Sequence, residues 1–250
     1  MIPAEHLIIP DWPAPPRVRA LQTTRQGGVS IAPYDSLNLG SHVGDIPLNV
    51  ARNRVLLNRL LPSEPVWLEQ VHGTRVANAD SADCLPQADA CIARHDDAVC
   101  VVMTADCLPV LLCDQQGTVV GAAHAGWRGL CDGVIEATVL AMDVAPQNLM
   151  VWMGPAISQA VFEVGEEVRA AFIAAQPQAA EAFVPSAGGR GKWLADLPAL
   201  ARLRLDRLGI TKIYGGNYCT WRERERFFSY RRDGTTGRMG TFIWLESDRS

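Results

Sequence analysis

Residues 104–129 decide the fold, and they read TADCLPVLLCDQQGTVVGAAHAGWRG. Two apolar runs, 108–113 and 118–123, flank the polar turn 114–117, which is the pattern of a β-hairpin with a four-residue loop. If Cys113 pairs with Thr118, then Cys107 lies directly opposite His124 at the open end of the hairpin. Because opposed residues have Cβ atoms about 5 Å apart, this thiol and this imidazole are predicted to meet. A cysteine that only packs beside a histidine is the alternative.

The composition is that of an ordinary globular protein. The chain has 250 residues, of which 48% are hydrophobic and 20% are charged. No internal repeat or linker interrupts it, so we expect one domain spanning residues 1–250. The net charge of −4 gives no electrostatic reason to expect a nucleic acid or a membrane as partner. A monomer or a homodimer is compatible with this sequence, since no long apolar stripe argues for assembly.

The cysteines and the N-terminus both favour a cytoplasmic protein. Seven cysteines is an odd number, and Cys100 and Cys113 lie inside apolar runs, which is typical of reduced thiols. Residues 1–16 contain several prolines but no basic segment followed by a long apolar one, so they do not resemble a signal peptide. No apolar run approaches the length of about 18 residues that a transmembrane helix needs.

Strands and helices alternate along the predicted fold. Helical spacing of apolar residues predicts helices at 45–61, 130–142, 163–174 and 196–208. Runs of β-type residues predict strands at 18–24, 66–71, 74–79, 90–92, 99–104, 149–153, 212–214 and 239–245, besides the hairpin. Residues 175–191 are rich in alanine and glycine and are expected to form an exposed loop.

Three candidate metal ligands stand at the ends of predicted strands: His72, Cys107 and His124. Two histidines and one thiolate suit zinc, and three protein ligands leave a fourth position open, as in catalytic sites. The same residues permit a rival chemistry, in which Cys107 is a nucleophile and His124 its base, with Asp106 or His72 orienting the histidine. The sequence does not separate these two alternatives.

Two further segments have the residues of an anion site. Arg25 precedes the pair Gly27-Gly28, with Asn38 nearby, and backbone N–H groups of such a loop can bind an anion. Arg128 stands at the start of the predicted helix 130–142, where free N–H groups also favour an anion. The alternatives are an ordinary surface turn at the first place and an ordinary glycine-rich strand–helix turn at the second.

Five stretches together resemble the YfiH family, whose members are also called laccase-domain or polyphenol oxidase family proteins. They are GGVSIAPYDSLNLGSHVGD, LEQVHG, TADCLPVLL, HAGWRGL and FFSYRRDGTTGRM, and the resemblance runs over residues 25–245. It implies a single α/β domain of layered mixed sheets with helices outside, similar to cysteine hydrolases of the cytotoxic-necrotizing-factor type. It also implies that His72, Cys107 and His124 bind zinc, or copper, at an active site.

The activity that the resemblance implies is on purine nucleosides. Members of the family resemble phosphorylases that convert adenosine, inosine, guanosine and methylthioadenosine to the base and ribose 1-phosphate, and that also deaminate adenosine. The expected partners are therefore a purine nucleoside and phosphate, with Arg25, Asn38 and Arg128 as candidate phosphate-binding residues. Bacterial members are also linked to peptidoglycan editing, which suggests a second function: a cysteine-dependent amidase that removes misincorporated serine from UDP-MurNAc-L-Ser. A third is a non-catalytic binding protein stabilised by a metal.

The sequence lacks the motifs of two of the enzyme classes that these names suggest, the multicopper oxidases and the zinc deaminases. The chain has five histidines and no His-x-His motif, so it can build at most one metal site and not the several sites of a multicopper oxidase. The zinc deaminase signature is also absent, because His124 is followed by Ala125 and Gly126. Any deamination would need another acid or base, for which Glu69 and Asp106 are candidates.

Overall fold

The strands of the chain form three β-sheets in the computed structural model, which describes residues 2–81 and 85–247. A six-stranded mixed sheet has the order β12-β8-β6-β7-β4-β3, a four-stranded sheet β1-β2-β13-β5, and a three-stranded sheet β10-β11-β9. The strands are β1 Leu7–Ile8, β2 Val18–Thr23, β3 Val76–Asn78, β4 Ala90–Ala93, β5 Cys100–Thr104, β6 Leu108–Asp114, β7 Val120–Ala125, β8 Leu149–Met153, β9 Glu163–Gly165, β10 Phe183–Pro185, β11 Lys192–Ala195, β12 Lys212–Gly215 and β13 Met239–Leu245.

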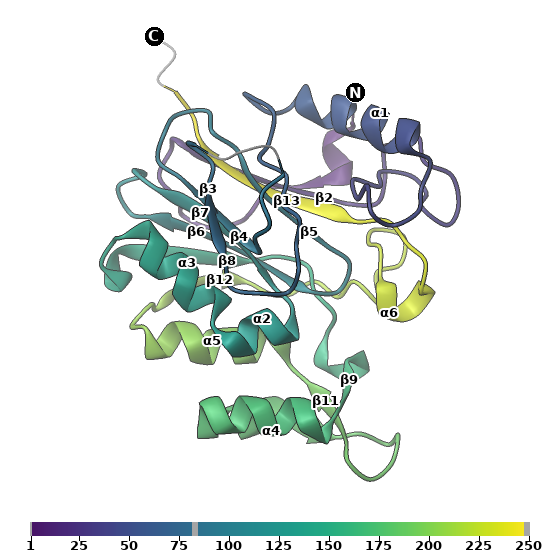
Figure 1. The fold of residues 1–250 in the computed structure, drawn as a ribbon, viewed down its shortest axis with the longest axis vertical. Helices are drawn as coiled ribbons and strands as arrows, with labels where there is room; N and C mark the ends of the chain where they lie inside the picture. The colour runs from purple at the N-terminus through teal and green to yellow at the C-terminus, as the bar shows by residue number, and fades with distance from the viewer. Residues whose placement is uncertain (1, 82–84, 248–250) are drawn as a thin grey trace.

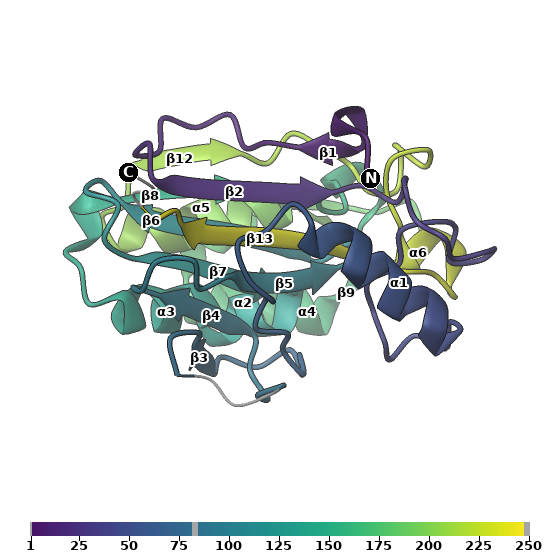
Figure 2. The ribbon, with the colours of Figure 1, turned by 90° about the horizontal axis from the view of Figure 1, so that it is seen from above.

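The two larger sheets lie face to face, with helices outside (Figures 1 and 2). Helix α1 covers the outer face of the four-stranded sheet, while α2, α3 and α5 cover the outer face of the six-stranded sheet. The three-stranded sheet and α4 lie beyond these helices. The helices are α1 Pro47–Asn58, α2 Trp127–Asp132, α3 Val134–Met142, α4 Glu166–Ala175, α5 Leu197–Arg207 and α6 Tyr230–Asp233, with 3-10 turns at Ala4–His6, Pro146–Asn148, Gln159–Val161 and Pro177–Ala182.

The central strands β6 and β7 are buried along their whole length and mostly apolar, as expected for strands that are covered on both faces. In β6, Val110 and Leu112 pack toward the helices, whereas Leu111 and Cys113 pack toward the four-stranded sheet. Side chains alternate in the same way along β7. His124 therefore shares the face of Ala122, which looks toward the four-stranded sheet.

The expected hairpin is present, but its predicted register is wrong by two residues. Cys113 pairs with Val120 and not with Thr118, so His124 lies opposite Pro109 and Cys107 lies beyond the end of the ladder. The cause is the side chain of Asp114, whose Oδ1 accepts the backbone N–H groups of Thr118, at 2.6 Å, and Val119, at 3.0 Å. These bonds draw Thr118 into the turn.

Other boundaries also differ from the predicted ones. The helix expected at 130–142 begins earlier and is divided at Gly133, whose φ of 101° only glycine adopts readily. Residues 66–71 form isolated bridges instead of a strand. The start of the helix expected at 163–174 is strand β9, and the loop expected at 175–191 contains β10. The strands expected at 149–153 and 239–245 are confirmed with their boundaries. Among the described residues, no helix combines the length and apolar character that crossing a bilayer requires.

Candidate metal centre

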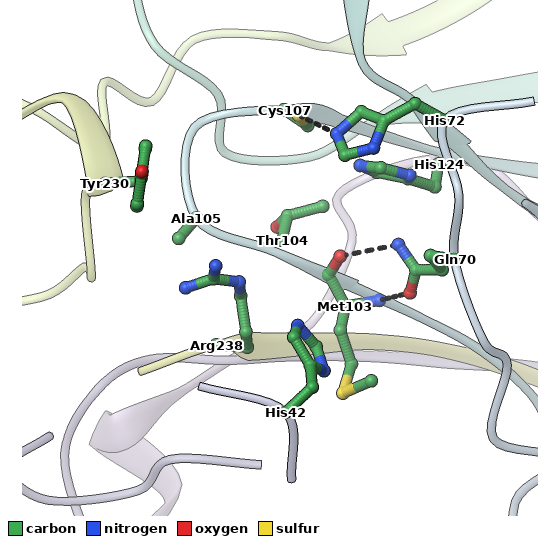
Figure 3. A pocket seen from close by; sticks show the side chains of 10 residues that line it. All are labelled: His42, Gln70, His72, Met103, Thr104, Ala105, Cys107, His124, Tyr230 and Arg238. Carbon is green, nitrogen blue, oxygen red and sulfur yellow. Dashed lines mark hydrogen bonds between the residues drawn. The ribbon is translucent and has the colours of Figure 1, made fainter. Parts of the chain in front are cut away.

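Three segments that are distant in the sequence bring His72, Cys107 and His124 together (Figure 3). Cys107 lies on the short connection by which the chain leaves β5, in one sheet, and enters β6, in the other. His124 lies in β7, and His72 lies in the loop before β3. The ligand atoms of the three residues lie within 4.8 Å of one another, and Cys107 Sγ lies 3.9 Å from His72 Nε2. The predicted cluster is therefore present in spite of the changed register.

The buried carboxylate of Asp89 orients the ring of His124 and holds the backbone of His72. Its Oδ1 lies 2.8 Å from His124 Nδ1 and accepts the backbone N–H of His72 at 2.9 Å, while Oδ2 accepts the N–H of Gly73 at 2.7 Å. His72 has a φ of 61°, which is uncommon for a residue with a side chain. A carboxylate bonded to one imidazole nitrogen leaves the other free to bind a metal. Sequence reasoning missed Asp89, because nothing distinguished it from the other acidic residues of its loop.

Gly126 explains part of the HAGWRG motif. A Cβ at this position would lie 2.8 Å from Cδ2 of His72 and 3.0 Å from Sγ of Cys107. Both distances are below ordinary van der Waals contact. Only glycine at position 126 leaves room for the side chains of His72 and Cys107 against the backbone.

Asp106 has a positioning role in the connection that carries Cys107. Its φ is 96°, and its carboxylate accepts the hydroxyl of Thr220 at 2.6 Å and the backbone N–H of Arg231 at 2.7 Å. Both oxygens are thus bonded and the side chain is buried, which leaves no free carboxylate for proton transfer. Glu69, the other acid considered from the sequence, is exposed and does not line the cavity beside the three ligands.

Cys107 and His124 form a charged pair when no metal is bound. Burial alone would raise the pKa of the Cys107 thiol, but His124 and His72 outweigh it by charge and hydrogen bonding and lower this pKa to about 6. Burial would lower the pKa of His124, but Cys107 and Asp89 raise it to about 9. Near neutral pH the pair is therefore a thiolate and an imidazolium. A thiolate is the form in which cysteine binds metals and attacks carbonyl carbons.

These donors fit one zinc ion. Within the described parts of the chain, no other group of three His, Cys, Asp or Glu side chains is arranged to hold a metal. Two imidazoles and a thiolate are zinc ligands, and the third protein ligand leaves a position open. His6 and His95 lie outside this cluster, so the several sites of a multicopper enzyme do not fit these residues.

A cavity of about 330 Å³ opens beside the three ligands, which is within the usual range for small-molecule sites. Gln70 is fixed in its wall, because its side-chain amide donates to the backbone oxygen of Met103 at 2.9 Å and accepts the Met103 N–H at 2.7 Å. Sequence reasoning missed most of the lining and left His42 without a role. The cavity is lined by His42, Gln70, His72, Met103, Thr104, Ala105, Cys107, His124, Tyr230 and Arg238.

A second, smaller cavity of about 130 Å³ lies on the other side of Cys107. It shares Ala105, Cys107 and Tyr230 with the first. Its remaining walls are mostly apolar, but two charged residues also line it: the full remaining set is Asp106, Trp127, Ile157, Phe162, Leu197 and Arg231. Cys107 therefore lies between a larger cavity with several polar side chains and a smaller one that is mostly, but not entirely, apolar.

The three predicted anion-binding residues are not brought to either cavity. The Arg25 guanidinium donates to the backbone oxygen of Asp35 at 2.8 Å and lies over the ring of Phe228, so it holds its own loop together. Asn38 is fully buried and bonds Gly40 and Asp45. Arg128 is exposed at the start of α2, 5.2 Å from the centre of the Trp127 ring.

The chain is similar to two named bacterial proteins over nearly its whole length. It is 54% identical over 239 residues to a purine nucleoside phosphorylase of Pseudomonas aeruginosa, covering 96% of this chain and 98% of that protein. It is also 54% identical to the purine nucleoside phosphorylase YfiH of Escherichia coli, with the same coverage.

Solved structures of similar proteins have the same fold. A Neisseria meningitidis protein that is 53% identical superposes with a TM-score of 0.93 and covers 97% of this chain and all of that one. YfiH of Bacillus licheniformis, 30% identical, gives a TM-score of 0.84 over 92% of this chain and 93% of its own. Residues 19–246 match the family model described as multi-copper polyphenol oxidoreductase laccase. The chain therefore belongs to the YfiH, or laccase-domain, family.

Proposed function

We propose that this protein is a zinc-dependent purine nucleoside phosphorylase that also deaminates adenosine. The observation that carries the proposal is the 54% identity, over nearly the whole chain, to relatives named purine nucleoside phosphorylases. The two cavities that meet at Cys107 support this proposal. The larger one, beside His72, Cys107 and His124, has several polar side chains, and the smaller one is mostly apolar. The substrates we propose are adenosine, inosine, guanosine and methylthioadenosine.

Phosphorolysis replaces one bond at the ribose C1′ by another. An oxygen of phosphate forms a bond to C1′, the glycosidic bond to the purine nitrogen breaks, and the electron pair leaves with the base, which takes up a proton. In our proposal the smaller, mostly apolar cavity, which Trp127 and Phe162 line, holds the base. Cys107 and His124 lie where the two cavities meet.

His72, Cys107 and His124 would hold the zinc ion, with Asp89 fixing the orientation of His124. Bound zinc supplies a Lewis acid and lowers the pKa of water in its open position, which is the chemistry that deamination needs. Copper is the alternative ion. No Asp or Glu side chain lines the larger cavity, so the proposed deamination would depend on a histidine for proton transfer.

Metal content and turnover test this proposal together. Protein purified without added metal should contain about one zinc per chain and release hypoxanthine from inosine only when phosphate is present. His124→Ala should lose zinc and turnover together, with circular dichroism reporting that it is folded. If the zinc-loaded wild type leaves inosine and phosphate unchanged, the proposed function is wrong.

The charged Cys107–His124 pair favours one other candidate, a cysteine amidase acting on UDP-MurNAc-L-Ser. Here the Cys107 thiolate would attack the amide carbonyl carbon, the C–N bond would break, and His124 would protonate the departing serine nitrogen before water released the acyl group. This candidate predicts metal-free protein with a reactive Cys107. A Cys107→Ala variant that keeps full amidase activity would exclude it.

A further inference from the structure

The guanidinium of Arg238 lies in the larger cavity without a carboxylate partner (Figure 3). Among the ion pairs of the described residues, none includes Arg238. Its side chain donates through Nη1 only, to the backbone oxygens of Thr236 at 3.1 Å and Gly237 at 3.0 Å. A partly buried cation with free donors is costly unless an anion binds to it.

His42 lies in the same cavity wall as Arg238 (Figure 3). Burial, and then the positive charges of Arg238 and Arg54, lower the pKa of His42 and so favour its neutral form. A neutral histidine still donates one N–H to a ligand. The complement of this wall is therefore an anion with several acceptor oxygens.

Thr104 supplies an independent sign of a ligand. Its side chain is 2% exposed, lines the cavity at the end of β5, and has an Oγ1 atom without a hydrogen-bond partner among the described residues. Buried hydroxyl groups nearly always have a partner. Figure 3 shows Thr104 between Arg238 and the three candidate metal ligands.

The chain holds Arg238 rigidly in this position. Its backbone N–H donates to Oδ1 of the buried Asn38 at 2.9 Å, and its carbonyl oxygen accepts the N–H of Leu39 at 3.1 Å. A Cβ on Gly40 would lie 2.8 Å from Cγ of Arg238, so the glycine makes room for this side chain. Asn38, expected from the sequence to bind phosphate, instead fixes the backbone of the residue that faces the cavity.

We propose that Arg238, together with His42 and the Thr104 hydroxyl, binds the phosphate co-substrate. The inference rests on the proposed phosphorylase function. Arginine suits the phosphate group because its planar fork of donors matches two oxygens at once. Displacement at C1′ brings the nucleophile to the face opposite the leaving base. With phosphate in the larger cavity and the base in the smaller one, the two reactants would lie on opposite sides of the ribose.

The test compares phosphate with nucleoside in the zinc-loaded protein. Arg238→Gln and Thr104→Val should each weaken binding of inorganic phosphate, measured by calorimetry, by about tenfold or more, because each removes a hydrogen bond to a charged group. The KM for phosphate should rise by the same factor while the KM for inosine changes less than about threefold. Arg207→Gln, at an exposed arginine on α5, is the matched control and should behave as wild type.

The outcomes separate this inference from the proposed function. Unchanged phosphate affinity in Arg238→Gln and Thr104→Val, or an equal rise in both KM values, overturns the inference and leaves the phosphorylase function in place. Wild type that binds phosphate through Arg238 but does not cleave inosine keeps the anion site and overturns the function. If Arg238→Gln melts far below wild type, the nearly isosteric Thr104→Val decides.

Discussion

The Oδ1 atom of Asp89 lies 2.8 Å from Nδ1 of His124 and also accepts the backbone N–H of His72. One buried carboxylate thus sets the orientation of one imidazole and the backbone conformation that carries the other.

Asp89→Asn should weaken zinc binding by about 10–100-fold. The amide has one accepting oxygen where the carboxylate has two, so the hydrogen bonds that orient His124 and hold the His72 loop cannot all form. Competition with a chromogenic chelator measures this affinity. Asp143→Asn, at an exposed position after α3, serves as the control. Zinc affinity equal to that of wild type would show that Asp89 does not position the ligands.

Alkylation of Cys107 in the metal-free protein should depend on pH with a midpoint near 6. The thiolate is the reacting form, and its pKa lies at about 6 instead of the ordinary 9. The rate should therefore be nearly constant from pH 7 to 9, fall as the pH drops through 6, and be suppressed by zinc. Iodoacetamide labelling followed by mass spectrometry identifies the site, and Cys113, whose pKa burial raises to about 12, should stay unlabelled. A rate that keeps rising up to pH 9 would contradict the charged pair.

Zinc affinity should increase with pH up to about 9. Near pH 7.5 the Cys107 thiol has already lost its proton, whereas His124, with a pKa of about 9, must release one before it can bind the metal. Calorimetry in two buffers with different heats of ionisation counts the protons released. A proton count that is the same at pH 7.5 and above pH 9 would show that His124 is already neutral.

Gly126→Ala should lower both zinc content and thermal stability. The new methyl group would overlap the His72 ring and the Cys107 sulfur, and overpacking of this kind costs about 1–3 kcal/mol. Zinc analysis and thermal melting are the measurements. Gly73→Ala is a matched control from the neighbouring loop, because its Cβ would meet Oδ2 of Asp89 at an ordinary 3.6 Å. Equal zinc content and melting temperature in the two variants would mean that the loop moves aside.

The candidate metal ligands could be predicted from the sequence because each is a metal-binding residue type near the end of an apolar run. The hairpin register could not, since it depends on how one carboxylate, that of Asp114, folds the turn. Arg238 and His42 come from opposite ends of the chain, and their positions depend on how two sheets pack. No local pattern reports such packing, so the cavity emerged only from the three-dimensional arrangement.

Arg238 directly precedes β13 in one sheet, His124 belongs to β7 in the other, and the chain passes between the two sheets at Cys107. The separation between the proposed phosphate-binding cation and the metal ligands is therefore an intersheet distance. Side chains in the layer between the sheets, such as Leu111 and Ile243, determine this distance without touching a substrate. In the proposed phosphorylase, a substitution in this interior layer would therefore change the distance between the bound phosphate and the metal ligands, and with it the rate.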